Sequence, residues 1–367
     1  MIAPTRASTL RAVALLCVSA APALCPWPAL AADAATPSQP YQMGQGLYFP
    51  AQALRVGGYA DLQYYGPDQK HSALSLEDLS LFLTKDVGSR WKFFTETELS
   101  DALSISHHQT KTKSATVDMQ RLYADYRASD VATIRFGKFL TPVGQWNLVH
   151  ADPLVWTTSR PLTTTAAFSR HMNGAMMYGT VTLSHNDVDY WLFVDDGKSL
   201  SFTSGDDDAY DAFGATSKLT NDFQHAVGGQ FLYHLLDDRL SLGASLLRYE
   251  LKNPRQQYRL AGLDFDWTGR FAEWSGEAVY RTADNAQTPD EYGGFLQAVV
   301  PLPRDLYLVG RYERYRNSLP RKTTAVETLG INYRPLPSIV VKFERIEGSN
   351  NDPFVPSGWF ASLGLLF

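Results

Sequence analysis

Cysteine is almost missing from this sequence. The 367 residues include two cysteines, Cys17 and Cys25, and both lie close to the N-terminus. The rest of the chain therefore has no disulfide scaffold, no cysteine-ligated metal site and no cysteine nucleophile. A cysteine-free chain also suits a protein that crosses an oxidising compartment unfolded, because it cannot form wrong disulfides there.

The N-terminus has the features of a secretory leader. Arg6 and Arg11 supply positive charge, an apolar stretch covers 12–24, and a pattern of small residues two apart ends at Ala31. The apolar stretch is short and prolines follow it closely, which argues against a membrane anchor. We predict a signal peptide at 1–31, with cleavage after Ala31.

Long apolar runs are also missing. After the leader, no run approaches the length of a helical membrane span. The chain has 33 basic and 38 acidic residues, and a net charge of −5 argues against nucleic acid as a partner. His-Glu-x-x-His and Gly-x-Ser-x-Gly patterns are not present. We therefore predict no catalytic residue, no metal site and no cofactor.

What the sequence does contain is a period of two. Residues 32–52 lack periodicity and are interpreted as a periplasmic lead-in. From residue 53 onward, apolar positions such as Val56 and Leu62 alternate with polar or aromatic ones such as Asp61. This texture continues to the C-terminus, so we predict a single all-β domain at 53–367.

The links between these segments alternate in length. Tight links carry turn residues, as at His185-Asn186 and Asp237-Asp238, and longer polar stretches lie between them. That alternation is typical of a transmembrane antiparallel β-barrel with short periplasmic turns and longer external loops. We count about sixteen strands. The least certain stretch is 196–224. The expected strands are 53–65, 74–85, 90–100, 117–127, 131–139, 173–183, 187–195, 225–236, 240–252, 257–267, 270–282, 291–300, 304–316, 323–335, 338–347 and 357–367.

The final segment has its own signature. Trp359, Leu363 and Leu365 share one face with Phe367, on which the sequence stops. This resembles the recognition signal that outer-membrane proteins present to the barrel-assembly machinery. We therefore predict the bacterial outer membrane as the location, with its lipid and lipopolysaccharide as surroundings, and Phe367 as the insertion signal.

Charged residues are expected to face the lumen, because a charge facing lipid costs about 2–4 kcal/mol near the midplane. A barrel of this size leaves an aqueous lumen. The mixture of signs leaves the ion preference open, and each charge can also be a solvated or paired wall residue. The residues assigned inward are Asp61, Lys92, Glu96, Glu98, Arg121, Asp125, Arg127, Arg135, Asp264, Asp266, Glu273, Glu277, Arg281, Arg311, Glu313, Arg334, Lys342 and Glu344.

Segment 140–172 differs from the other links. It carries Trp146, Trp156 and Phe168 among polar residues, and a loop lying wholly outside would be more polar. We predict that this third loop folds inward, packs on the wall and narrows the pore. Solute would then meet a constriction, for which we select Asp152, Arg160, Arg170, Arg135 and Lys138. Arginine can grip phosphate or carboxylate through its fork of donors. The alternative is that Arg160 and Arg170 only tie the loop in place.

The stretch Arg135-Phe136-Gly137-Lys138-Phe139-Leu140-Thr141-Pro142-Val143-Gly144 resembles the strand-then-loop motif of the phosphate-selective porin (O/P-type) family. The resemblance implies trimers of sixteen-stranded channels. One departure concerns selectivity. Phosphate channels of this family carry dense arginine and lysine rows, whereas the lumen inferred for this chain is mixed and slightly acidic.

These observations predict a porin for passive diffusion of small hydrophilic solutes, which could include anions such as phosphate or carboxylates. Two alternatives stay open. One is an outer-membrane barrel enzyme such as a lipid hydrolase, since Ser, His and an acid can meet in space without a sequence motif. The other is a non-conducting structural or adhesin barrel, which would favour a plugged lumen.

Overall fold

The computed structural model describes residues 41–42, 45–68, 71–106, 109–111, 115–196, 223–252, 255–318, 321–349, 355 and 357–367. The predicted signal peptide lies outside the described residues, and so does most of 196–224. No helix in the described part combines the length and the apolar character that a membrane span needs.

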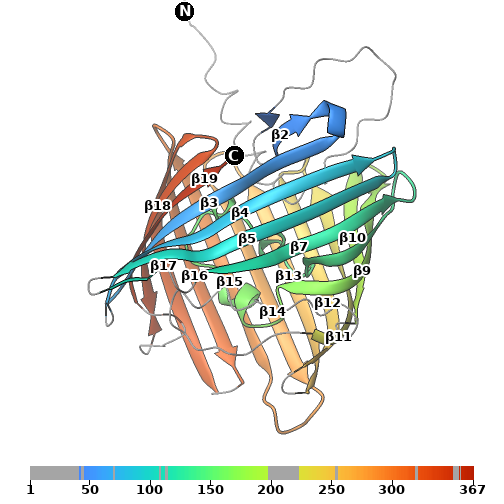
Figure 1. The fold of residues 1–367 in the computed structure, drawn as a ribbon. Coiled ribbons are helices and arrows are strands. Elements are labelled where there is room, and N and C mark those ends of the chain that lie inside the picture. The colour runs from blue at the N-terminus through green and yellow to red at the C-terminus, as the bar shows by residue number, and fades with distance from the viewer. Residues whose placement is uncertain are drawn as a thin grey trace, which may run out of the picture.

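Sixteen long antiparallel strands form a closed barrel, which confirms the predicted fold class (Figure 1). Each strand pairs with its neighbour in the sequence, and β19 pairs back with β3 to close the ring. The strands are β3 (Leu54–Pro67), β4 (Ala73–Val87), β5 (Trp91–Ser106), β7 (Thr116–Arg127), β8 (Thr133–Leu140), β9 (His171–Leu183), β10 (Asn186–Asp195), β11 (Phe223–Leu235), β12 (Leu240–Leu251), β13 (Gln257–Thr268), β14 (Glu273–Ala283), β15 (Glu291–Leu302), β16 (Leu306–Asn317), β17 (Lys322–Leu336), β18 (Ile339–Gly348) and β19 (Gly358–Leu366).

Alternation along each strand separates the two faces of the wall. In β12, Leu242 and Leu246 are exposed outward while Ser241 and Ser245 are buried inward. The outer face is apolar over most of the barrel, as lipid requires. Exposed aromatic residues gather near both ends of the strands, where the membrane interfaces would lie. At the short-turn end they include Trp91, Trp267, Trp274 and Tyr333, and at the other end Tyr64, Tyr280, Tyr292 and Trp359.

The two ends of the barrel have different connections. Short turns join β9 to β10 at 184–185 and β15 to β16 at 303–305, and they lie at the same end as the start of β3. Arg304 and Asp305 both have positive φ, 66° and 59°. Two successive positive φ angles are the geometry that suits a tight hairpin turn. Longer links lie at the opposite end, as the sequence predicts.

The seam between β3 and β19, the first and last strands of the barrel, is closely packed at the C-terminal end of β19. Gly58 and Phe367 exchange two backbone hydrogen bonds of 2.9 and 3.0 Å. A Cβ at Gly58 would lie 2.8 Å from the Phe367 ring and 2.1 Å from the carbonyl oxygen of Ser80. Phe367 therefore lies over a position that only glycine can occupy.

The region preceding the barrel is not wholly irregular. Within 32–52, the short strands β1 (Tyr41–Gln42) and β2 (Gly46–Phe49) pair with each other, and a 3-10 helix η1 (Pro50–Gln52) follows. β2 also pairs with β3, while a third short strand, β6 (Gln109–Lys111), pairs with β5. A two-residue strand is too short to show a period, which is why the sequence did not indicate it.

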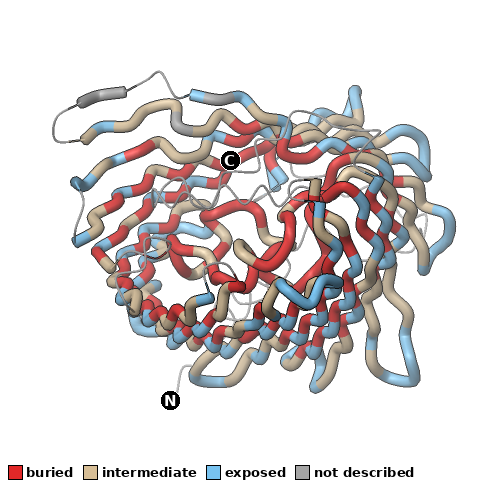
Figure 2. Tube along the Cα trace, turned by 90° about the horizontal axis from the view of Figure 1, so that it is seen from below, coloured by how far each residue is buried: buried red, intermediate tan, exposed pale blue. Residues whose placement is uncertain are grey.

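The link between β8 and β9 folds into the barrel. We call residues 141–170 the inward segment; it contains η2 (Trp146–Leu148), η3 (Asp152–Leu154) and the one-turn helix α2 (Leu162–Thr165). Most of its residues are buried, and Figure 2 shows buried chain within the ring of strands. Helix α2 contacts β14, β15 and β16, and η3 contacts β3 and β19. The predicted inward-folded third loop is confirmed.

Candidate functional site in the barrel lumen

Three wall carboxylates hold the backbone of the inward segment. Glu277 on β14 accepts the backbone N–H groups of Gln145 and Trp146, both at 2.8 Å. Glu344 on β18 accepts those of Thr158 and Ser159 at 3.0 and 2.9 Å. Hydrogen bonds to a charged acceptor are about twice as strong as neutral ones.

A third carboxylate, Glu313 on β16, accepts the backbone N–H of Leu162 at 2.8 Å. Leu162 begins α2, where unpaired N–H groups favour an anion. Arg311 completes this contact, since its Nε donates to Glu313 at 2.7 Å and its other nitrogens reach Thr157 and Ser159. Arg311 and Glu313, both predicted to line the lumen, thus lie at the loop and support it.

Donors on the wall, one cationic and one neutral, satisfy carbonyl groups of the same segment. Lys342, which is fully buried, donates to the carbonyls of Asp152 and Thr157 at 2.6 and 3.1 Å. Asn332 donates to the carbonyl of Trp156 at 2.6 Å. A segment without long helices or strands leaves many backbone groups unpaired, and the wall supplies their partners.

Two tryptophans fix the segment to β15 and β16. Trp146 meets Phe295 edge to face at 6.2 Å, and Trp156 lies 5.0 Å from Tyr307, centroid to centroid. Arg334 lies 4.7 Å from the ring centre of Trp156. The apolar residues that suggested an inward fold in the sequence do anchor the loop on the wall.

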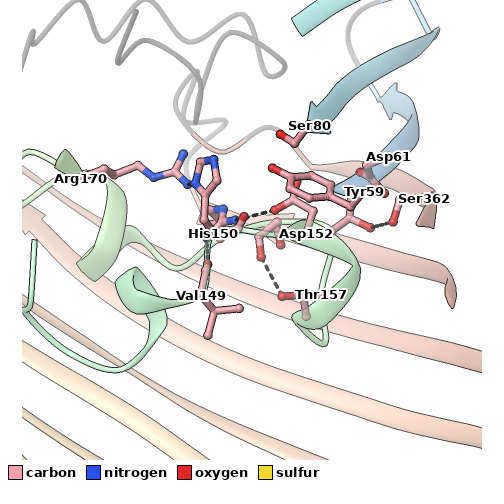
Figure 3. A network of polar contacts seen from close by, with 12 residues as sticks. Tyr59, Asp61, Ser80, Val149, His150, Asp152, Thr157, Arg170 and Ser362 are labelled. Carbon is pink, nitrogen blue, oxygen red and sulfur yellow. Dashed lines mark hydrogen bonds and ion pairs between the residues drawn. The ribbon is translucent and has the colours of Figure 1, made fainter. Parts of the chain in front are cut away.

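The segment also reaches the opposite wall, at His150. Figure 3 shows its ring between Arg170 and Tyr59. Arg170 Nη2 lies 2.9 Å from His150 Nδ1, and a guanidinium can only donate. Nδ1 is therefore the acceptor and Nε2 carries the proton. Nε2 then faces Glu98 Oε2 at 3.3 Å.

Glu98 is the centre of this contact. Besides His150 it accepts from the hydroxyl groups of Tyr59, Ser80 and Ser100 and from an amide. Its distances to those hydroxyls run from 2.9 to 3.2 Å. These hydrogen bonds offset the cost of burying the Glu98 carboxylate, which therefore stays charged.

Ligand atoms of Glu96, Glu98 and His150 lie within 4.8 Å of one another, which is a possible metal arrangement among the described residues. Two contacts oppose it. Arg121 already pairs with Glu96. A metal on Nε2 would place the ring proton on Nδ1, directly against the Arg170 donor. The arrangement fits a salt-bridged network better than a metal centre.

Asp152 and Arg160 neutralise each other inside the segment. Arg160 Nη2 donates to Asp152 Oδ1 at 2.6 Å and to the carbonyl of His150, and its Nη1 donates to the carbonyl of Val149. Burial by itself would raise the pKa of Asp152, but the charges of Arg160 and Lys342 hold it below its usual range. Asp152 is therefore an anion matched by a cation.

The other residues selected from the sequence lie apart from the inward segment. Arg135 forms a bidentate pair with Asp125, at 2.7 and 2.9 Å, and covers the Tyr123 ring at 3.6 Å. Lys138 is opposite Asn173 in the ladder, on the other face of β8 from Phe139, which packs in the lumen core.

Three further residues that the sequence predicts to line the lumen lie elsewhere on the wall. Arg121 pairs with Glu96 and lies 4.8 Å from the Phe94 ring centre. Lys92 is half-buried near the short-turn end of β5. Arg127 pairs with the exposed Asp130 at 2.7 Å. None of these contacts involves the inward segment.

Comparison with known proteins places the fold. No protein-family model matches the chain. An uncharacterized protein of Aquifex aeolicus is 24% identical over 353 residues, which cover 83% of this chain and 78% of that protein. Among solved structures, an anion-selective porin from Comamonas acidovorans is similar with a TM-score of 0.59 at 13% identity, over 86% of this chain and 99% of that one.

Two other solved structures are similar to the same degree. OmpF of Salmonella typhi, in complex with daunomycin, has a TM-score of 0.59 at 10% identity, covering 88% of this chain and 99% of its own. The trimer form of OmpT, an outer membrane protein of Vibrio cholerae, has a TM-score of 0.57 at 9% identity, covering 86% and 99%. The fold is that of a bacterial outer-membrane porin.

Proposed function

We propose that this protein is a passive diffusion channel for small hydrophilic solutes in the bacterial outer membrane. The inward segment carries the proposal, because its hydrogen bonds to β14, β16 and β18 hold it inside a barrel of porin size. A wall lined with buried charges surrounds it. Such an arrangement lets side chains of the segment and the wall select what passes.

The test is reconstitution of the full barrel into planar lipid bilayers. A channel gives discrete steps of current, each from one insertion. Folded protein that inserts but produces no steps would remove the channel and favour the structural barrel. Circular dichroism of the same preparation shows whether the strands have formed.

One contact favours a second candidate, a hydrolase. Ser241 Oγ lies 3.4 Å from His234 Nδ1, and His234 Nε2 lies 3.0 Å from Asp189 Oδ2. These are the residue types of a Ser-His-Asp triad, although the two ring nitrogens are exchanged relative to the usual arrangement, in which serine faces Nε2 and aspartate faces Nδ1. However, Asp238 also faces Nδ1 at 3.7 Å and Asp266 is opposite Ser241 in the ladder. Nearby carboxylates oppose the negative charge that develops on a substrate carbonyl oxygen.

Esterase and phospholipase assays on the detergent-solubilised barrel distinguish the channel from the hydrolase. The channel predicts no turnover above a blank, and the same result for Ser241→Ala. Hydrolysis that disappears with Ser241→Ala but survives Ser245→Ala, a buried serine on the same face of β12, would establish the enzyme.

We also propose a homotrimer surrounded by outer-membrane lipid and lipopolysaccharide and inserted by the barrel-assembly machinery. Support comes from the similar Vibrio cholerae structure, which is a trimer form, and from the apolar outer face. Native mass spectrometry from detergent should give three copies; a single copy at every concentration would contradict this. The finer resemblance to phosphate-selective porins stays a prediction.

A further inference from the structure

One part of the lumen wall carries acids without matching bases. Asp264 and Asp266 on β13 and Glu273 and Glu277 on β14 face inward on adjacent strands, and Asp264 is opposite Glu277 in the ladder. We call these four residues the acidic wall. Asp264 and Glu277 are buried against the start of the inward segment, whereas Asp266 and Glu273 are half-buried toward the short-turn end.

None of these four carboxylates forms an ion pair with any residue in the described part of the chain. Asp264 accepts from the Gln145 amide at 2.8 Å, and Glu277 accepts two backbone N–H groups. Arg334 acts on Glu273 from a distance, but its guanidinium donates to the carbonyls of Pro153 and Val155. These neutral donors leave the negative charge of the wall largely uncompensated.

Two buried amides beside the acidic wall also favour a ligand that brings hydrogen-bond donors or positive charge. Gln230 is fully buried, bonds to Asp264, and uses its Nε2 on the carbonyl of Gly144 at 3.1 Å. Gln297 is buried and lies opposite Ser275, between the acids of β14. The Oε1 atoms of both amides, and Asp264 Oδ2, accept no hydrogen bond. Buried acceptors without donors call for a partner that brings donors or positive charge.

Arg334 and Lys342 donate to backbone carbonyls of the inward segment, but three other basic residues that could attract anions are each compensated by an acid. Arg160 is matched by Asp152, Arg135 by Asp125, and Arg311 by Glu313. Their fields largely cancel at the distance of a passing solute. The carboxylates of the acidic wall have no such partners, so their negative charge is not cancelled locally, and low-dielectric walls focus its field into the lumen.

We infer that the channel favours cationic solutes and that the acidic wall is the determinant. This inference rests on the proposed channel function and decides the ion preference that the mixed signs of the sequence left open. A small cation or an alkylammonium group would meet Asp266 and Glu273, the less buried pair, while Asp264 and Glu277 lie deeper against the inward segment.

The test is the reversal potential of single channels in a KCl gradient. Low salt is preferable, since the screening length is about 10 Å at 0.1 M. The current through the native channel should reverse at a potential on the same side of zero as the equilibrium potential of potassium. In Asp266→Asn with Glu273→Gln, the potential should move toward zero or to the chloride side. Glu327→Gln, which removes one carboxylate from the outward face of β17 and so matches the single variant Glu273→Gln in charge, should leave it unchanged.

The outcomes distinguish the channel from its ion preference. No current steps from folded protein would remove the channel and this inference together. Steps that reverse on the chloride side, or that ignore the double variant, would overturn the cation preference and leave the channel. If the double variant fails to fold, Glu273→Gln alone decides, because its half-buried side chain tolerates an isosteric amide.

Discussion

Glu344 shows at the scale of one residue how the lumen holds its loop. Its carboxylate accepts two backbone N–H groups of the inward segment and is almost fully buried. The period of two in the sequence assigns Glu277, Glu313 and Glu344 to the lumen, where the structure places them. It could not give their partners, because these are main-chain atoms more than 130 residues away.

Replacing Glu344 with Ala should free residues 158–159. Each buried N–H left unpaired costs about 1–3 kcal/mol, so this part of the segment should open more often. Hydrogen exchange followed by mass spectrometry should show faster exchange in peptides covering 156–160. Glu347→Ala, an exposed acid on the same strand, is the control and should leave those peptides unchanged. Unaltered exchange in Glu344→Ala would show that Glu344 does not hold the segment.

His150 is a residue whose role the sequence did not indicate. Its partners Glu98 and Arg170 come from a strand and from the far end of the same segment. No spacing rule links these three positions, so only the fold shows the network. The same holds for Arg160, whose ion pair is with Asp152 in its own loop rather than with a wall acid.

At the scale of elements, the strands follow closely from the alternation of apolar residues and from the turn chemistry. The sequence predicted all sixteen long strands, with ends that differ from the structure by a few residues. It missed β1, β2 and β6, which have two to four residues each. Short strands are fixed by the neighbour they pair with and not by their own pattern.

The seam of β3 and β19 allows a prediction at this scale. Gly58→Ala should destabilise the barrel by about 1–3 kcal/mol, the usual cost of overpacking, because its Cβ would meet a backbone oxygen and the Phe367 ring. The midpoint of unfolding in guanidinium chloride measures this. Gly310→Ala on β16, where a Cβ meets nothing within 4 Å, is the matched control. Equal midpoints for both variants would mean that the seam is not tight there.

At the scale of the whole molecule, the inward segment occupies part of a barrel that would otherwise be an open cylinder. Its contacts reach β3 and β5 on one side and β13 to β18 on the other. The sequence could predict that the loop enters the barrel, because of its tryptophans. It could not predict how many strands the loop would contact, since that depends on the whole ring of side chains.

Excising the loop is feasible because its two ends meet. Thr141 N donates to Arg170 O at 2.8 Å, so a short Gly-Ser linker can replace 143–168 without stretching β8 or β9. Removing wall contacts will lower stability, but the strand ladder remains complete. The barrel should still close, which circular dichroism can verify.

The most direct test measures the single-channel conductance of this loop-excised barrel and of the native barrel in the same bilayers and salt. It shows whether the inward segment limits the width of the passage. If it does, the native protein gives discrete steps and the excised protein gives distinctly larger ones. Steps of equal size in the two proteins would show that the passage lies elsewhere and would contradict the role proposed for the inward segment.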